Sequence, residues 1–187
     1  MILNWLPAII VFNLPGLLWL AFSPASNRKF GENFITVFGI SSAFYTLLFL
    51  STYVFRYKLS ETILWSLWGL LLLVVVLKIV PKISNGWASL RSFRPASSLT
   101  DLVFILLFVG ILILRFYQIK DLVLPAWVDS LHHVLIVRIL LEQKQIPLSL
   151  KPYVDVPFYY HFGFHTIAAI VAQLTNLSPE KTVLYFG

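Results

Sequence analysis

Five long apolar segments constrain the fold of this chain more than any other feature of its sequence. A transmembrane helix needs about 20 mostly apolar residues to cross the hydrocarbon core of a bilayer. Segments of that kind occupy residues 2–22, 34–55, 62–80, 101–119 and 158–175. No run shows the strict alternation that is typical of outer-membrane barrel strands. The sequence therefore predicts an all-α fold, a multi-pass bundle of transmembrane helices.

The composition agrees with this class and excludes others. Hydrophobic residues make up 59% of the 187 residues and charged residues only 12%, whereas a soluble domain carries about 25% charged residues. The chain contains no cysteine, so disulfides and thiolate metal sites are excluded. The net charge of +6 lies in loops and at the ends of apolar segments. This distribution favours contact with lipid headgroups over binding of nucleic acid.

Basic residues in the loops predict the orientation in the membrane. They are concentrated in the loops at 23–33 and 81–100, as Arg28, Lys29, Lys82, Arg91 and Arg94. Short loops rich in lysine and arginine stay on the cytoplasmic side, so the N-terminus and residues 120–157 are expected outside. Arg56 and Lys58, in the short loop at 56–61, weaken this signal without reversing it.

The chain is expected to have three regions. Four N-terminal helices occupy residues 1–119, an outward loop occupies 120–157, and a fifth helix with the start of a sixth occupies 158–187. The tripeptide Ser178-Pro179-Glu180 is typical of a helix start, since serine caps well, proline suits the first helical position and an acid suits the first turn. Only about two helical turns follow, so we expect the chain to be the N-terminal part of a larger protein.

The outward loop is too long for a simple connection between helices. Residues 129–143 are predicted to form an amphipathic helix that lies in the plane of the membrane interface. Arg138 and Glu142 are spaced as an i, i+4 pair on its far side. Three prolines prevent a continuous helix over residues 146–157.

All four histidines lie in or beside this loop. Asp129, His132 and His133 have the i, i+3, i+4 spacing that puts side chains on one face of a helix. His161 and His165 are also four residues apart, at the mouth of the expected fifth helix. Because an ionisable group inside a membrane span is costly, such a group is a candidate for function. This cluster is therefore the predicted site.

Each residue of this cluster also has a simpler interpretation. Asp129 fits the N-cap position of its helix. The histidines fit polar positions at the membrane interface, where Tyr159, Tyr160 and His161 would form an aromatic belt. Asp155 fits a turn between prolines.

Two segments, WVDSLHHVLIVRILLEQKQIP and YYHFGFHTIAAIVA, resemble a D-x-x-x-H … Y-x-x-G-x-H stretch of prokaryotic membrane proteins of the GT-C glycosyltransferase superfamily. That superfamily includes protein mannosyltransferases, oligosaccharyltransferases and aminoarabinose transferases. The resemblance covers about residues 124–175, and it implies that the membrane is the plasma membrane of a prokaryote. The chain departs from the family in two respects. The catalytic loop of the family usually follows the first span rather than the fourth, and its members have many more spans.

The resemblance implies that a sugar is transferred from a polyprenyl-phosphate donor in the lipid bilayer to an acceptor on the outer face. Asp129 would be the base that deprotonates the acceptor hydroxyl, with His133 and His165 as further catalytic residues. Cationic and polar groups would hold the substrate and the departing phosphate. That expected substrate-binding set is His132, Arg138, Lys151, Asp155, Tyr160 and His161. No cofactor follows with certainty, and a divalent metal ion stays an open alternative.

Two other functions compete with this one. A metal site is the first, because Asp129 and all four histidines (His132, His133, His161 and His165) are ligand types that zinc accepts. No HExxH motif accompanies them. The second is a non-enzymatic membrane subunit or a transporter, in which the polar cluster would line a solute path.

Overall fold

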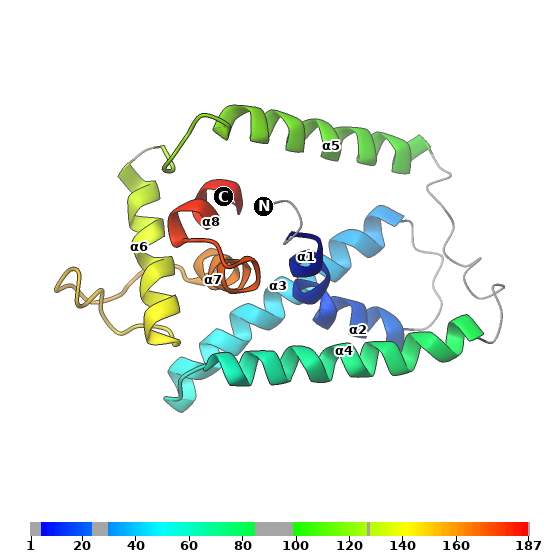
Figure 1. Cartoon of the computed structure of the whole chain (residues 1–187), viewed down its shortest axis with the longest axis horizontal. Helices are drawn as coiled ribbons and strands as arrows, with labels where there is room; N and C mark the ends of the chain where they lie inside the picture. The colour runs from blue at the N-terminus through cyan, green and yellow to red at the C-terminus, as the bar shows by residue number, and fades with distance from the viewer. Residues whose placement is uncertain (1–4, 24–29, 85–98, 127, 187) are drawn as a thin grey trace. The chain divides into compact units, whose positions relative to one another are not determined.

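The structure is a computed structural model that describes residues 5–23, 30–84, 99–126 and 128–186. Arg28, Lys29, Arg91 and Arg94, on which the expected orientation depends, lie outside the described residues. The helices, in chain order (Figure 1), are α1 (Trp5–Phe12), α2 (Leu14–Phe22), α3 (Phe30–Phe55), α4 (Glu61–Ser84), α5 (Leu99–Ile119), α6 (Val128–Gln143), α7 (Gly163–Thr175) and α8 (Pro179–Phe186).

The described chain is all-helical, as the sequence predicts. Its extended pairing is limited to an isolated bridge between Ser149 and Pro157 in the proline-containing segment after α6. Three helices are long and apolar enough to cross a membrane, over Gly31–Phe55, Glu61–Lys78 and Leu99–Ile119. A fourth span is counted if α1 and α2 are taken together as one broken span. These helices make the chain a membrane protein.

The expected first span is interrupted at Asn13, between α1 and α2. Pro15 lies in the first turn of α2, where its missing N–H costs no helical hydrogen bond. Pro7 lies inside α1 and does not break it. A side chain on Gly16 would overlap the carbonyl group of Val37 in α3, and the Gly16 N–H donates to Ser41 Oγ at 3.0 Å. The absent side chain therefore lets α2 approach α3 closely.

The expected fifth span is shorter in the structure than in the sequence-based prediction. α7 begins at Gly163 rather than 158 and has 13 residues, which is about 20 Å of helix. Asn176 ends it in the left-handed conformation, with φ 56°. Because a hydrocarbon core is about 30 Å thick, α7 is too short to cross a bilayer by itself. It is not among the candidate membrane spans of the described chain.

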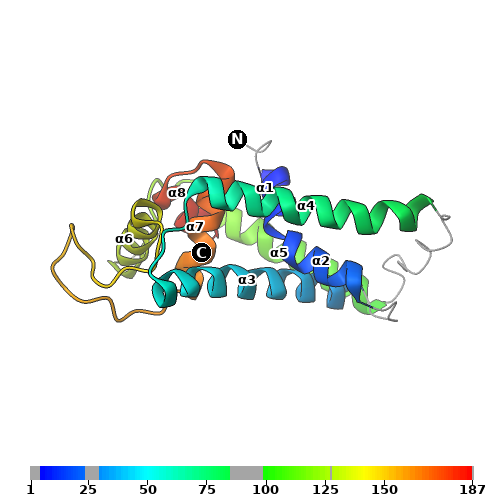
Figure 2. The ribbon, with the colours of Figure 1, turned by 90° about the horizontal axis from the view of Figure 1, so that it is seen from below.

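By internal contacts the chain divides into two compact units. The first draws its described residues from 1–12, 42–65 and 121–187, and the second from 13–41 and 66–120. Within the first unit, α7 packs against α1, α6 and α8. Helices α6, α7 and α8 lie side by side in both views (Figure 1, Figure 2). Protein rather than lipid therefore covers α7.

The turn between α3 and α4 holds the end of α6. The Leu59 N–H donates to the carbonyl oxygen of Lys144 at 2.6 Å, and the Ile146 N–H donates to Thr52 Oγ1 at 3.1 Å. In sequence, α4 and α5 lie between the two segments that meet here. Two complete crossings return a chain to the side from which it started, so this contact agrees with α4 and α5 both spanning the membrane.

Helix α6 confirms the predicted helix over 129–143 to within a residue, but its surroundings differ from the prediction. Ile136, Val137 and Ile139 are completely buried, because α7 and α8 cover them. The helix is therefore part of a packed unit rather than a lone interfacial element.

The expected pairing of Arg138 with Glu142 is also wrong. Arg138 forms an ion pair with Glu180 of α8, whereas Glu142 accepts a hydrogen bond from the Tyr153 hydroxyl at 2.6 Å. Both partners lie outside α6, because α8 and the segment after α6 fold back onto it.

Candidate functional site

The candidate site centres on two histidine rings that are in direct contact. The Nδ1 atom of His133, on α6, lies 2.9 Å from the Nε2 atom of His165, on α7. At that distance one nitrogen donates its proton and the other accepts it. The pair therefore shares one proton across the interface between the two helices.

The local fold explains why these two of the four histidines meet. α6 and α7 pack along each other, and His165 lies in the first turn of α7. His165 is 1% exposed, while His133 is half-buried and His161, before the start of α7, is exposed. The i, i+4 relation of His161 and His165 therefore does not put them in one environment.

Tyr160 lies against all four histidine rings. Its ring centroid is 5.3 Å from that of His132, 5.6 Å from that of His133, 5.5 Å from that of His165 and 5.7 Å from that of His161. Phe164 completes the enclosure at 5.9 Å from the His133 ring. Tyr160 is 40% exposed. Its side chain therefore covers the histidines on one side and faces outward on the other.

Burial controls the protonation of His165. Loss of solvation, followed by the charge of neighbouring His133, lowers the pKa of His165 from 6.5 to about 4, although the nearby backbone of His161 acts in the opposite direction. Among the described residues, its Nδ1 atom has no hydrogen-bond partner within normal geometry. His165 is therefore neutral at neutral pH and serves as an uncharged partner for His133.

Two of the predicted substrate-binding cations are already paired with carboxylates. Arg138 pairs with Glu180, whose charge raises the pKa of Arg138. Lys151 Nζ lies 3.0 Å from Asp155 Oδ1, and both side chains are largely exposed. These pairs reduce the positive charge that the expected substrate phosphate would meet.

Asp129 lies one helical turn before His133 on α6. Helix α6 begins at Val128, so Asp129 is inside the first turn rather than at the N-cap, where its charge suits the positive end of the helix. Its side chain is exposed. No hydrogen bond joins its carboxylate to the histidines of the described chain.

The alternative metal site is not formed. Within the described ranges, no three His, Cys, Asp or Glu side chains are grouped so that they could hold a metal ion. The five residues proposed for it (Asp129, His132, His133, His161 and His165) do not converge as such a group. His133 and His165 bond to each other, while His132 and His161 face the Tyr160 ring and Asp129 is exposed.

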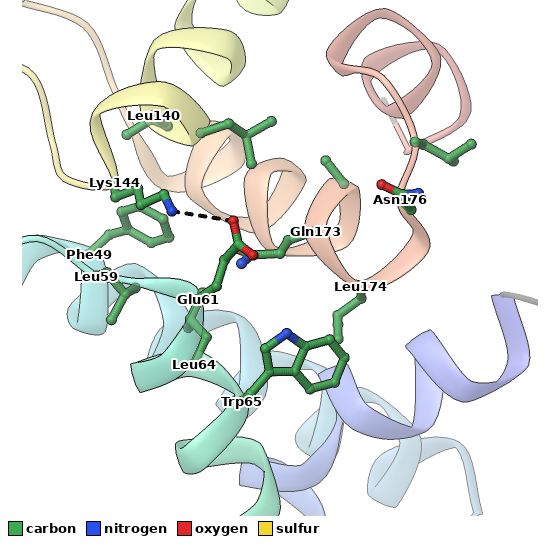
Figure 3. Close-up of a pocket in the computed structure, with 13 residues that line it drawn as sticks. Phe49, Leu59, Glu61, Leu64, Trp65, Leu140, Lys144, Gln173, Leu174 and Asn176 are labelled. Carbon is green, nitrogen blue, oxygen red and sulfur yellow. Dashed lines mark hydrogen bonds and ion pairs between the residues drawn. The ribbon is translucent and has the colours of Figure 1, made fainter.

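A pocket that the sequence did not indicate lies elsewhere in the first unit. It has a volume of about 490 Å³. Residues 59–65, at the start of α4, form one side of it, and the C-terminal ends of α6 and α7 form the other. Lys144 Nζ and Glu61 Oε1 face each other in it at 3.3 Å (Figure 3). These two residues are 83 positions apart in the sequence, so no local motif could have paired them.

Comparison with known proteins leaves the family open. No family model matches the chain, and neither the curated proteins nor the solved structures include a match. The resemblance to GT-C glycosyltransferases therefore rests on the segments around the histidines alone.

Proposed function

We propose that the chain acts in a multi-pass membrane glycosyltransferase of GT-C type, in which the histidine pair accepts the proton of the acceptor hydroxyl. The observation that carries this proposal is the 2.9 Å contact between His133 Nδ1 and His165 Nε2. Both residues belong to the segments that resemble the family. The donor would be a sugar on polyprenyl phosphate, which the bilayer delivers to the first unit.

A hydrogen-bonded histidine pair suits general-base catalysis. With His165 Nε2 as the acceptor, His133 carries its proton on Nδ1 and presents the lone pair of Nε2 to a hydroxyl. As the hydroxyl oxygen attacks the anomeric carbon, its proton moves to His133 Nε2, and the polyprenyl phosphate leaves with the electron pair of the broken bond. The resulting imidazolium stays hydrogen-bonded to neutral His165, which stabilises it.

The other residues around the pair have roles that follow from their positions. Tyr160 is half in the cluster and half exposed, and its ring can pack against a sugar. His132 and His161 flank Tyr160 and are proposed to donate hydrogen bonds to the donor phosphate. Arg138 and Lys151 are left out of this assignment because carboxylates compensate their charges.

The proposal is tested by release of polyprenyl phosphate from a panel of polyprenyl-phosphate sugars, with the chain in liposomes. His133→Gln is expected to lower the rate at least about 100-fold, the usual contribution of a positioned base. Asp129→Asn tests the alternative base that the family resemblance implies. A comparable loss of rate in this variant would identify Asp129 as the base. Glu142→Gln, at an exposed position of α6, is the matched control and is expected to retain the rate.

Two results would count against the proposal. Undiminished turnover in His133→Gln would remove the histidine pair from the chemistry. Absence of polyprenyl phosphate release from every donor, with the protein folded and inserted, would end the glycosyltransferase assignment.

A further inference from the structure

The pocket beside the start of α4 combines apolar walls with one cation and one anion. Its apolar lining comes from Phe49, Leu64, Leu140 and Leu174, among others. Lys144 and Glu61 are the charged groups, and both reach the open side, with side chains 38% and 65% exposed. Figure 3 shows Lys144 and Glu61 pointing toward each other and Trp65 on the wall below them. The pocket is therefore amphipathic.

Its place along the chain puts the pocket at a membrane boundary. Glu61 is the first residue of the candidate span Glu61–Lys78. Trp65, which is 56% exposed, lies one turn further along this span. Tryptophan is enriched at the depth of lipid headgroups. A ligand in this pocket would have its polar part at Glu61 and Lys144 and its apolar part along Trp65.

The cation is held in place by the backbone. Lys144 ends α6 in the left-handed conformation, with φ 57°. Its N–H donates to the Leu140 carbonyl oxygen at 2.9 Å, and its own carbonyl oxygen accepts from Leu59 at 2.6 Å. The backbone of Lys144 is therefore anchored beside the start of α4, within reach of Glu61.

We propose that this pocket binds a zwitterionic phospholipid, with the lipid phosphate at Lys144 and a primary ammonium headgroup at Glu61. Binding of such a headgroup would replace the exposed Lys144–Glu61 ion pair by two ion pairs, one between Lys144 and the phosphate and one between Glu61 and the ammonium group. A purely anionic headgroup would be repelled by Glu61, and a purely cationic ligand by Lys144. The acyl chains would lie against the apolar wall that leads into the span.

Native mass spectrometry of the full chain tests this site. The protein is purified in detergent, freed of co-purified lipid and given equal amounts of phosphatidylethanolamine and phosphatidylglycerol. The wild type is expected to retain phosphatidylethanolamine several-fold over phosphatidylglycerol. Lys144→Gln should lower that retention at least five-fold, and Glu61→Gln should lower it and abolish the preference between the two lipids.

A matched control removes one positive charge outside the pocket. Lys58→Gln lies in the same turn as Leu59, is exposed and should leave retention unchanged. Because Glu61 and Lys144 lie on different helices, Glu61→Gln gives an independent result if Lys144→Gln does not fold.

Three outcomes would overturn the proposal. The first is equal retention of both lipids by the wild type. The second is an equal loss in Lys58→Gln, which would reflect net charge alone. The third is displacement of the lipid by free phosphoethanolamine as effectively as by the whole lipid, because the apolar wall would then contribute nothing.

Discussion

Helices α5 and α7 are both apolar, yet they differ in how much of each is buried within the protein. α5 has 21 residues, and only 6% of its most apolar 18-residue stretch is buried within the protein. α7 has 13 residues, and its buried set includes His165, Thr166 and Thr175 as well as alanines and aliphatic side chains. An apolar sequence therefore predicts that a helix is shielded from water, but it does not predict whether protein or lipid shields it. The long helix α5 leaves most of its apolar surface free to face lipid, whereas other helices of the first unit cover the short helix α7.

Truncation of one side chain in each helix should separate the two environments most strongly. Ile170 of α7 is 0% exposed and Ile113 of α5 is 63% exposed. Ile170→Ala is expected to lower the free energy of unfolding by about 2–5 kcal/mol, because it leaves a cavity among α1, α6 and α8. Ile113→Ala should change it by less than about 0.5 kcal/mol. Thermal unfolding in detergent gives both values, and equal losses would mean that protein covers α5 as well.

A charge in α5 tests whether lipid surrounds that helix. Ile113 lies about one turn from the middle of α5. Ile113→Arg is expected to raise the apparent free energy of membrane insertion by up to about 2.5–3.5 kcal/mol, the cost of arginine at the centre of a span. Leu99→Arg, at the first residue of the helix, is the control, since its side chain reaches the interface at little cost. A glycosylation-mapping insertion assay measures both variants. Full insertion of Ile113→Arg would contradict the assignment of α5 as a span.

The buried histidine of α7 should make stability depend on pH. His165 has a pKa of about 4 in the folded protein, against 6.5 as its ordinary value, so the unfolded state binds more protons between these two pH values. Its contribution to the free energy of unfolding is therefore complete above pH 6.5 and is lost as the pH falls toward 4, by at most about 1.4 kcal/mol per pH unit.

This dependence is measured as the difference between wild-type and His165→Gln unfolding curves from pH 7.5 to 4.5. The variant is expected to lose the slope, whereas His161→Gln, at an exposed position, should keep it. Identical slopes for the wild type and His165→Gln would show that His165 is not buried as described.

The smallest expected effect concerns the ion pair between α6 and α8. Arg138 and Glu180 have side chains 41% and 22% exposed, so solvent screens the pair and a coupling of less than about 1 kcal/mol is expected. A double-mutant cycle with Arg138→Gln and Glu180→Gln measures it. The same cycle with Glu142→Gln should give no coupling, and a larger value for Glu142 would restore the pairing that the sequence predicts.

The long helices were predictable because their signal is local. Segments of about 20 mostly apolar residues define α3, α4 and α5 whatever their neighbours, and proline at position 15 marks the break after Asn13. The prediction of a span over 158–175 was wrong because hydropathy does not show where in an apolar segment the regular helix begins. Pro157 and the irregular residues after it delay α7 until Gly163.

The sequence predicted which segments contain the candidate site, but not which side chains touch each other there. Helical spacing placed Asp129, His132 and His133 on one face, but which histidine touches which depends on how α6 packs on α7. The contact of His133 with His165 crosses 32 positions, and the Glu61–Lys144 pair crosses 83. Such contacts follow from tertiary packing, which no single-sequence pattern contains.

The most direct test of the histidine site is a ¹⁵N NMR experiment on histidine-labelled protein in detergent micelles. The chain has four histidines, and single substitutions assign their signals. The account predicts a scalar coupling across the hydrogen bond between Nδ1 of His133 and Nε2 of His165, together with a His165 ring that stays neutral until the pH approaches 4. No coupling, with a His165 ring that titrates near 6.5, would contradict the contact on which the proposed chemistry depends.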